Sequence, residues 1–219
     1  MENLMAHKNM TKDEAKNEAV RMLQKVGIPE PEKRVRQYPH EFSGGMRQRV
    51  VIAIAVACRP QILICDEPTT ALDVTIQAQI LELMQSLQKK LGMAIIMVTH
   101  DLGVIADMCD EIIVMYGGRV CERGTAEDIF YRPAHEYTKG LLRSIPNVDR
   151  IGEKLVPGTP INLLNMPKGC AFCPRCENAM KICLEEQAPE VQMPDGHFAS
   201  CWLSVKELME NQKGAGSNE

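Results

Sequence analysis

The sequence has no long apolar run, no strong charge of one sign and no signal-peptide pattern. Its longest uncharged apolar run is VVIAIAVAC (50–58), whereas a helix that crosses a bilayer needs about 20 such residues. The net charge of −4 creates no basic field, so nucleic acid is not expected as a partner. The first residues are polar and do not resemble a secretory leader. We therefore expect a cytosolic protein, or one that meets a membrane through a partner protein.

Apolar periodicity predicts that helices and strands alternate along most of the chain. Helices are expected where apolar residues recur every three or four positions, and strands where apolar residues run together. The predicted helices are 11–26, 43–58, 74–90, 125–131 and 134–144. The predicted strands are 61–65, 93–100 and two strands within 111–124, joined by a Gly-Gly turn. Uniformly apolar strands joined by a helix indicate an α/β fold with a parallel sheet covered by helices on both faces.

The composition changes near residue 145 and suggests a division into domains. Residues 1–144 form the predicted α/β domain. Residues 145–169 are rich in proline and glycine and lack helical periodicity, which is typical of an extended linker. Residues 170–219 are expected to form a small tail domain that is rich in cysteine.

Two adjacent acids, Asp66 and Glu67, follow the strand ILIC (62–65). In an open parallel sheet, ligands bind at the carboxyl ends of the strands, where these acids are expected to lie. One carboxylate there can hold Mg²⁺ beside nucleotide phosphates, and the other can orient or deprotonate a water molecule. A strand that simply ends in polar residues at the surface would show the same pair.

Two further segments have residues suited to phosphate. Ser43, Gly44 and Gly45 open a predicted helix, whose free backbone amides and dipole favour an anion. His100 ends the strand that follows Glu67, and its imidazole could contact a terminal phosphate. Each feature alone has an ordinary explanation, a serine-capped helix or a hydrogen-bonded neutral histidine.

The order of these motifs resembles the ATP-binding subunits of ABC transporters. FSGGM (42–46) is similar to the signature motif, ILICDE (62–67) to the Walker B strand, TTALD (69–73) to the D-loop and VTH (98–100) to the switch histidine. The strings HEFSGGMRQRVVIAIAVACRPQILICDEPTTALDVTIQAQIL, YRPAHEYTKGLLRSIP and FCPRC resemble the peptide-importer branch of that family, the oligopeptide and dipeptide permease ATPases.

The resemblance implies roles, cofactors and partners. Glu67 and His100 would be catalytic, and Asp66 would hold Mg²⁺ beside ATP. Contacts to nucleotide are implied for Ser43, Gly44, Gly45, Met46 and Asp73. The subunit would pair head to tail with a second ATPase subunit, so that Ser43, Gly44 and Gly45 serve the partner's nucleotide. Two membrane permease subunits, and indirectly a peptide-binding protein, would place it on the inner face of the cell membrane.

One motif of that family does not occur in these 219 residues. The phosphate-binding loop G-x-x-x-x-G-K-[ST], which precedes the signature motif in the family, is not present. The chain is therefore expected to correspond to the carboxyl-terminal part of such a subunit, and its ability to hydrolyse ATP alone is in question. Two other functions stay open: a non-transport ABC ATPase, and a non-enzymatic module that lends its signature motif to a partner or senses redox state.

The tail holds five cysteines, at 170, 173, 176, 183 and 201. A short segment with few apolar residues needs an additional stabilising link, and a cytosolic location disfavours disulfides. Zinc or an iron–sulfur cluster remains. The family resemblance implies a four-iron four-sulfur cluster on Cys170, Cys176, Cys183 and Cys201, with zinc as the alternative. Cys173 departs from the family pattern and could compete as a ligand.

Overall fold

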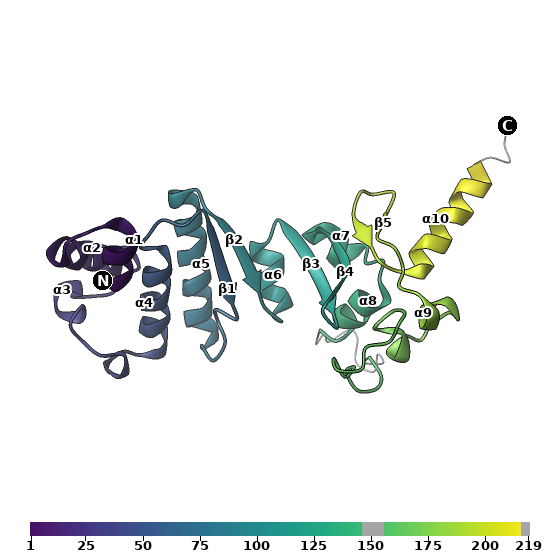
Figure 1. The fold of residues 1–219 in the computed structure, drawn as a ribbon, viewed down its shortest axis with the longest axis horizontal. Coiled ribbons are helices and arrows are strands. Elements are labelled where there is room, and N and C mark those ends of the chain that lie inside the picture. The colour runs from purple at the N-terminus through teal and green to yellow at the C-terminus, as the bar shows by residue number, and fades with distance from the viewer. Residues whose placement is uncertain (146–155, 216–219) are drawn as a thin grey trace. The chain divides into compact units, whose positions relative to one another are not determined.

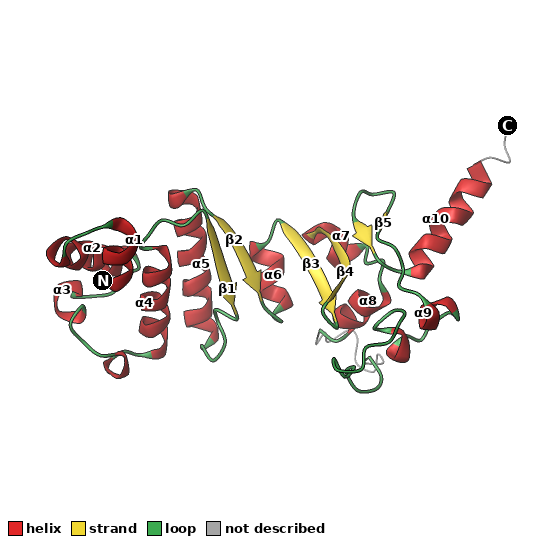
Figure 2. Ribbon diagram, in the orientation of Figure 1, coloured by secondary structure: helices red, strands yellow, loops and turns green. Residues whose placement is uncertain are grey.

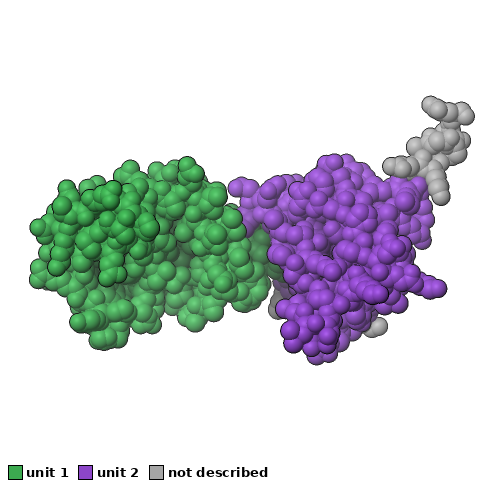
Figure 3. Space-filling view, viewed as in Figure 1, with its two compact units in different colours: residues 1–108 green, residues 109–219 purple. Residues whose placement is uncertain are grey.

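The computed structural model describes residues 1–145 and 156–215 (Figure 1). The chain divides into two compact units, Met1–Met108 and Cys109–Glu219, which Figure 3 draws in different colours. The division predicted from the sequence, at 1–144, 145–169 and 170–219, stays a prediction. The predicted linker lies partly outside the described residues.

The first unit begins with a series of helices (Figure 2), and the predicted signature motif lies at the start of the last of these. They are α1 (Glu2–Lys8), α2 (Lys12–Lys25), α3 (Pro31–Arg34), the 3-10 helix η1 (Pro39–Glu41) and α4 (Gly44–Val56). Helix α2 starts with a capping box, in which Thr11 and Glu14 satisfy each other's backbone amides. Helix α4 starts at Ser43, whose hydroxyl accepts a hydrogen bond from the Met46 amide.

Two parallel strands follow, β1 (Ile62–Asp66) and β2 (Ala94–Val98). Helix α5 (Val74–Leu91) connects them, and α6 (Leu102–Met108) comes after β2. Apolar side chains on one face of this pair are exposed, since Ile64 is 68% and Val98 51% accessible. Helices therefore cover only one face of the described strands, and the prediction of two covered faces is wrong for this part of the sheet.

The core of the first unit lies where α2, α4 and α5 meet β1. Its fully buried members include Val26, Val56, Ile80 and Met84. Burying each such side chain contributes about 1.5–3 kcal/mol. This core holds α4 and α5, the two helices that Ser43 and Asp73 cap.

The second unit is built on the antiparallel hairpin of β3 (Glu111–Tyr116) and β4 (Arg119–Thr125). Gly117 and Gly118 form its predicted turn, and both have positive φ angles, 57° and 73°, which glycine adopts without strain. Helices α7 (Ala126–Tyr131) and α8 (Glu136–Arg143) follow.

The cysteine-bearing segment completes the same sheet instead of forming a sheet of its own. Its elements are η3 (Cys173–Arg175), α9 (Ile182–Glu185), β5 (Val191–Gln192), β6 (Phe198–Ala199) and α10 (Trp202–Ala215). Strand β6 pairs with β4, which gives the order β3-β4-β6-β5. No helix in the described part of the chain combines the length and the apolar character that a bilayer crossing requires.

Candidate functional site

The ends of β1 and β2 lie side by side. The two strands are parallel and Asp66 pairs with Val98, so the residues that follow each strand emerge at one edge. The Glu67 amide donates to the Val98 carbonyl at 2.8 Å, which extends this pairing by one step. Glu67 and His100, far apart in the sequence, thereby reach the same place.

Glu67 and His100, two of the predicted site residues, are in direct contact. His100 Nδ1 lies 2.6 Å from Glu67 Oε1, and the Thr70 hydroxyl donates to Glu67 Oε2 at 2.6 Å. The Thr70 hydroxyl and then His100 lower the pKa of Glu67, and the Glu67 carboxylate raises the pKa of His100. The carboxylate is therefore ionised at neutral pH, and Nδ1–H of the imidazole is the donor.

Glu67 has an unusual backbone conformation for a residue with a side chain. Its φ of 49° lies in the left-handed region, which costs of order 1–3 kcal/mol for residues other than glycine. Two turn hydrogen bonds hold the segment, from the Thr70 amide to the Glu67 carbonyl and from the Leu72 amide to the Thr69 carbonyl. The turn ends at Asp73, whose carboxylate caps α5 by accepting from the Ile76 amide at 2.9 Å.

The predicted signature residues lie at the start of α4, directly against the start of α5. Ser43 and Gly44 are exposed, whereas Gly45 and Met46 are half-buried. A Cβ atom on Gly45 would come within 2.6 Å of the Ile76 Cγ2 atom, so glycine is what permits this close approach. The signature segment and the helix capped by Asp73 thus form one packed contact.

Sequence reasoning missed three side chains around the Glu67–His100 contact: Thr70, Gln77 and Asp101. Asp101 accepts from Gln77 Nε2 at 2.9 Å and from the amides of Gly103 and Val104, which caps α6. Thr70 and Asp101 could have been suspected from their closeness to Glu67 and His100 in the sequence. Gln77 gave no comparable signal.

The prediction of an iron–sulfur cluster in the tail is wrong for the described residues. Zinc, the alternative, finds no support there either. All nine cysteines are free. Among the described residues, the five tail thiols included, one group of three potential ligands has its ligand atoms within 4.8 Å of one another, and it contains no cysteine. Cys170 and Cys176 pack against a core around Tyr116 and Phe172. Burial raises the pKa of Cys170, and that of Cys176 to about 11.

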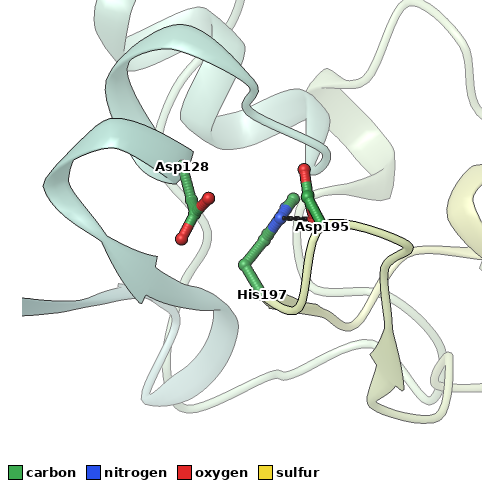
Figure 4. Close-up of side chains that lie close together, drawn as sticks. All are labelled: Asp128, Asp195 and His197. Atoms are coloured by element: carbon green, nitrogen blue, oxygen red, sulfur yellow. Dashed lines mark hydrogen bonds and ion pairs between the residues drawn. The ribbon is translucent and has the colours of Figure 1, made fainter.

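That group of three consists of Asp128, Asp195 and His197 (Figure 4). His197 Nδ1 lies 2.6 Å from Asp195, and the Arg132 guanidinium contacts Asp128 at 2.6 Å and Asp195 at 3.5 Å. Hydrogen bonds from Thr125 and then the contact with Arg132 lower the pKa of Asp128 to about 2. Because Arg132 already supplies the positive charge that a metal ion would bring, we interpret the cluster as structural.

The same cluster reaches the completely buried Glu122 of β4. Its two carboxylate oxygens accept from the amides of Ala134 and His135, at 2.6 and 3.0 Å. His197 Nε2 lies 3.3 Å from Glu122 Oε1, within ion-pair distance but outside hydrogen-bond geometry. The contact therefore lies between β4 and the turn of the β5–β6 hairpin, and β6 pairs with β4 through its backbone.

Two protein families match this chain. Residues 1–70 match the ABC transporter family, and residues 121–183 match the carboxyl-terminal region of oligopeptide/dipeptide transporters. The first match includes the signature segment and Glu67, and the second includes β4, α7, α8 and most of the tail cysteines.

Curated relatives extend the similarity over nearly the whole chain. The oligopeptide transport ATP-binding protein OppD of Escherichia coli is 54% identical over 95% of this chain and 62% of its own length. OppD of Bacillus subtilis is 56% identical over 91% of this chain and 57% of its own length. The dipeptide transport ATP-binding protein DppD of Bacillus subtilis is 53% identical over 92% of this chain and 61% of its own length. The chain therefore spans about three fifths of the length of these relatives.

A solved structure supports the fold. The protein cbiO1 from Clostridium perfringens, part of the ABC transporter complex cbiONQ, superposes with a TM-score of 0.51 at 32% identity, over 58% of this chain and 49% of that one. The predicted α/β ABC-type ATPase fold is thereby confirmed. The chain is a homologue of the ATP-binding subunits of oligopeptide and dipeptide ABC transporters, as its motifs predict.

Proposed function

We propose that this chain forms part of the ATP-hydrolysing subunit of an ABC importer that couples ATP hydrolysis to the uptake of oligopeptides or dipeptides. The observation that carries the proposal is the 2.6 Å contact between Glu67 and His100 at the carboxyl ends of two parallel strands. The relatives named as peptide transport ATP-binding proteins support the choice of substrate.

At the chain's own nucleotide, Glu67 accepts a proton from the attacking water. His100 donates Nδ1–H to Glu67 Oε1 and Thr70 donates to Oε2, so both contacts hold the carboxylate ionised and oriented. Asp66 ends β1 with an exposed carboxylate, and oxygen ligands of this kind suit Mg²⁺. When bound, Mg²⁺ neutralises charge on the ATP phosphates.

At a second nucleotide, held by a partner ATPase subunit in a head-to-tail dimer, the start of α4 provides the contacts. Ser43, Gly44, Gly45 and Met46 would present a hydroxyl and free backbone amides to the phosphates. Asp73 would lie beside them, because α5 packs on α4 through Ile76 and Gly45.

The subunit would work at the cytoplasmic face of the membrane, bound to two permease subunits. A peptide-binding protein would deliver substrate to those permeases and would contact this chain only indirectly. Support for these partners comes from the family and not from a surface of the described residues.

The roles of Glu67 and Asp66 can be separated in a chimera that joins the preceding segment of Escherichia coli OppD to this chain. We expect Glu67→Gln to lower kcat by at least about 100-fold, the usual loss when a general base is removed, with ATP affinity retained. Asp66→Asn should instead weaken Mg²⁺-dependent ATP binding. Steady-state hydrolysis and binding of a fluorescent ATP analogue measure the two effects.

Glu82→Gln, the same change at an exposed position of α5, is the matched control and should leave both quantities unchanged. If Glu67→Gln hydrolyses ATP as fast as the parent chimera, the proposed role of Glu67 is wrong. If the parent chimera neither binds nor hydrolyses ATP, the proposed function itself fails.

A further inference from the structure

The contact between His100 and Glu67 needs support from elsewhere in the fold. The His100 side chain is 81% exposed and that of Glu67 37%. An exposed pair gains little energy from its own attraction and must hold two mobile side chains in one geometry. The backbone that carries His100 must therefore be fixed by other contacts.

Asp101, the next residue, fixes that backbone from two sides. Its amide donates to the Thr99 hydroxyl at 3.1 Å. Its Oδ1 atom accepts from the amides of Gly103 and Val104, at 3.0 and 3.3 Å, which ties His100 to the start of α6. These bonds are all local, and they would move together with the segment.

The Oδ2 atom of Asp101 has a partner on a different element. Gln77 Nε2 on α5 donates to it at 2.9 Å, and both side chains are half-buried. This hydrogen bond is the main cause of the lowered pKa of Asp101. A hydrogen bond to an ionised acceptor is stronger than one between neutral groups.

Helix α5 is a suitable anchor because it is fixed at the same end. Asp73 caps its first turn four positions before Gln77, and Ile76 packs on Gly45 of α4. The turn that begins at Glu67 runs directly into Asp73. A link from α5 to Asp101 therefore joins the His100 segment to the element that follows Glu67.

We propose that Gln77 is a positioning residue that holds His100 against Glu67 by binding Asp101 Oδ2. Gln77 touches neither the imidazole nor the carboxylate, and it acts through Asp101. The inference rests on the proposed function for its catalytic consequence, whereas its structural part concerns only residues of this chain.

The test measures the titration of His100 in the full 219-residue chain, by NMR of ¹³C-labelled histidine assigned with His100→Gln. Glu67 raises the pKa of His100, so that pKa reports how close the two groups are. Gln77→Leu removes the donor without changing charge and should lower the pKa of His100 towards its ordinary value. Gln88→Leu, the same substitution about three turns farther along α5, is the control and should leave that pKa unchanged.

A double variant provides the rescue. In Gln77→Glu with Asp101→Asn, the carboxylate and the amide exchange places, so total charge is kept and the hydrogen bond can form in reverse. Asn also caps helices as well as Asp does. This variant should restore the raised pKa of His100. An unchanged His100 titration in folded Gln77→Leu, or a double variant that stays at the low value, would overturn the proposal.

The catalytic consequence is measured separately, in the OppD chimera. Gln77→Leu should lower kcat about 10-fold with the KM for ATP nearly unchanged, because one charge-assisted hydrogen bond is lost from an orienting contact. The double variant should recover most of that loss. A parent chimera without hydrolysis would count against the proposed function, while the histidine titration would still decide the role of Gln77.

Discussion

Acid should destabilise the second unit through one buried histidine, His135. Its side chain is nearly inaccessible, and its Nδ1 atom caps α8 by accepting from the Tyr137 amide at 3.0 Å. Burial lowers the pKa of His135 to about 4, and only a smaller effect of Glu136 opposes this. Protonation would place a charge in the core and would remove the acceptor of the cap.

His135 binds a proton at a lower pH in the folded chain than in the unfolded chain. The unfolded chain binds a proton at His135 near pH 6.5, whereas the folded chain resists protonation until about pH 4. The free energy of unfolding therefore falls as the pH falls through this interval. At about 1.4 kcal/mol for each pKa unit, the titration of His135 lowers the free energy of unfolding by about 2.5 kcal/mol between about pH 7 and about pH 4.5.

Urea unfolding followed by tryptophan fluorescence measures this loss. Trp202 is the sole tryptophan and lies in the second unit, where its Nε1 atom donates to the Glu186 carbonyl at 3.0 Å. His135→Asn keeps an acceptor for the Tyr137 amide and does not titrate. The variant should lose about 2.5 kcal/mol less than the parent over the same pH change. Equal losses in parent and variant would refute the reasoning.

Two further predictions concern packing. Gly45→Ala should destabilise the first unit by about 1–3 kcal/mol, since the new methyl group would lie 2.6 Å from Ile76 Cγ2. Urea unfolding followed by circular dichroism measures this loss, and adding Ile76→Ala to the same chain should recover part of it. An unchanged unfolding midpoint for Gly45→Ala would contradict the prediction. Burial raises the pKa of Cys121 to about 12, so iodoacetamide at about pH 8 should alkylate this thiol only after unfolding. Mass spectrometry of the Cys121 peptide measures the alkylation. A folded chain that reacts as fast as the unfolded one would contradict the prediction.

Local patterns were enough to predict most elements of the first unit. The apolar stripes of 11–26 and 74–90 and the apolar strands at 61–65 and 93–100 correspond to α2, α5, β1 and β2. The placement of Glu67 and His100 at one edge of the sheet was predictable because both residues follow strands that the helix between them makes parallel. Each helix and strand could be predicted from residues that are close together in the sequence.

The errors and omissions have a common cause, which is information held in distant contacts. An apolar strand has the same sequence pattern whether one face or both are covered, so the pattern alone does not show that Ile64 is exposed. Cysteine spacing does not distinguish metal ligands from thiols packed on an aromatic core. The bond between Gln77 and Asp101 depends on how α5 lies beside α6, which neither sequence segment determines alone.

The pairing of β6 with β4 also affects how the protein is made. A ribosome releases β4 long before its neighbour exists, since even the ion pair between Arg123 and Glu190 joins positions 67 residues apart. During that interval the free edge of β4 can pair with a strand of another nascent chain. Chains truncated between residues 185 and 197 would lack β6, so the edge of β4 would stay unpaired and Glu122 would lack its contact with His197. Such truncated chains should aggregate or be degraded by proteases.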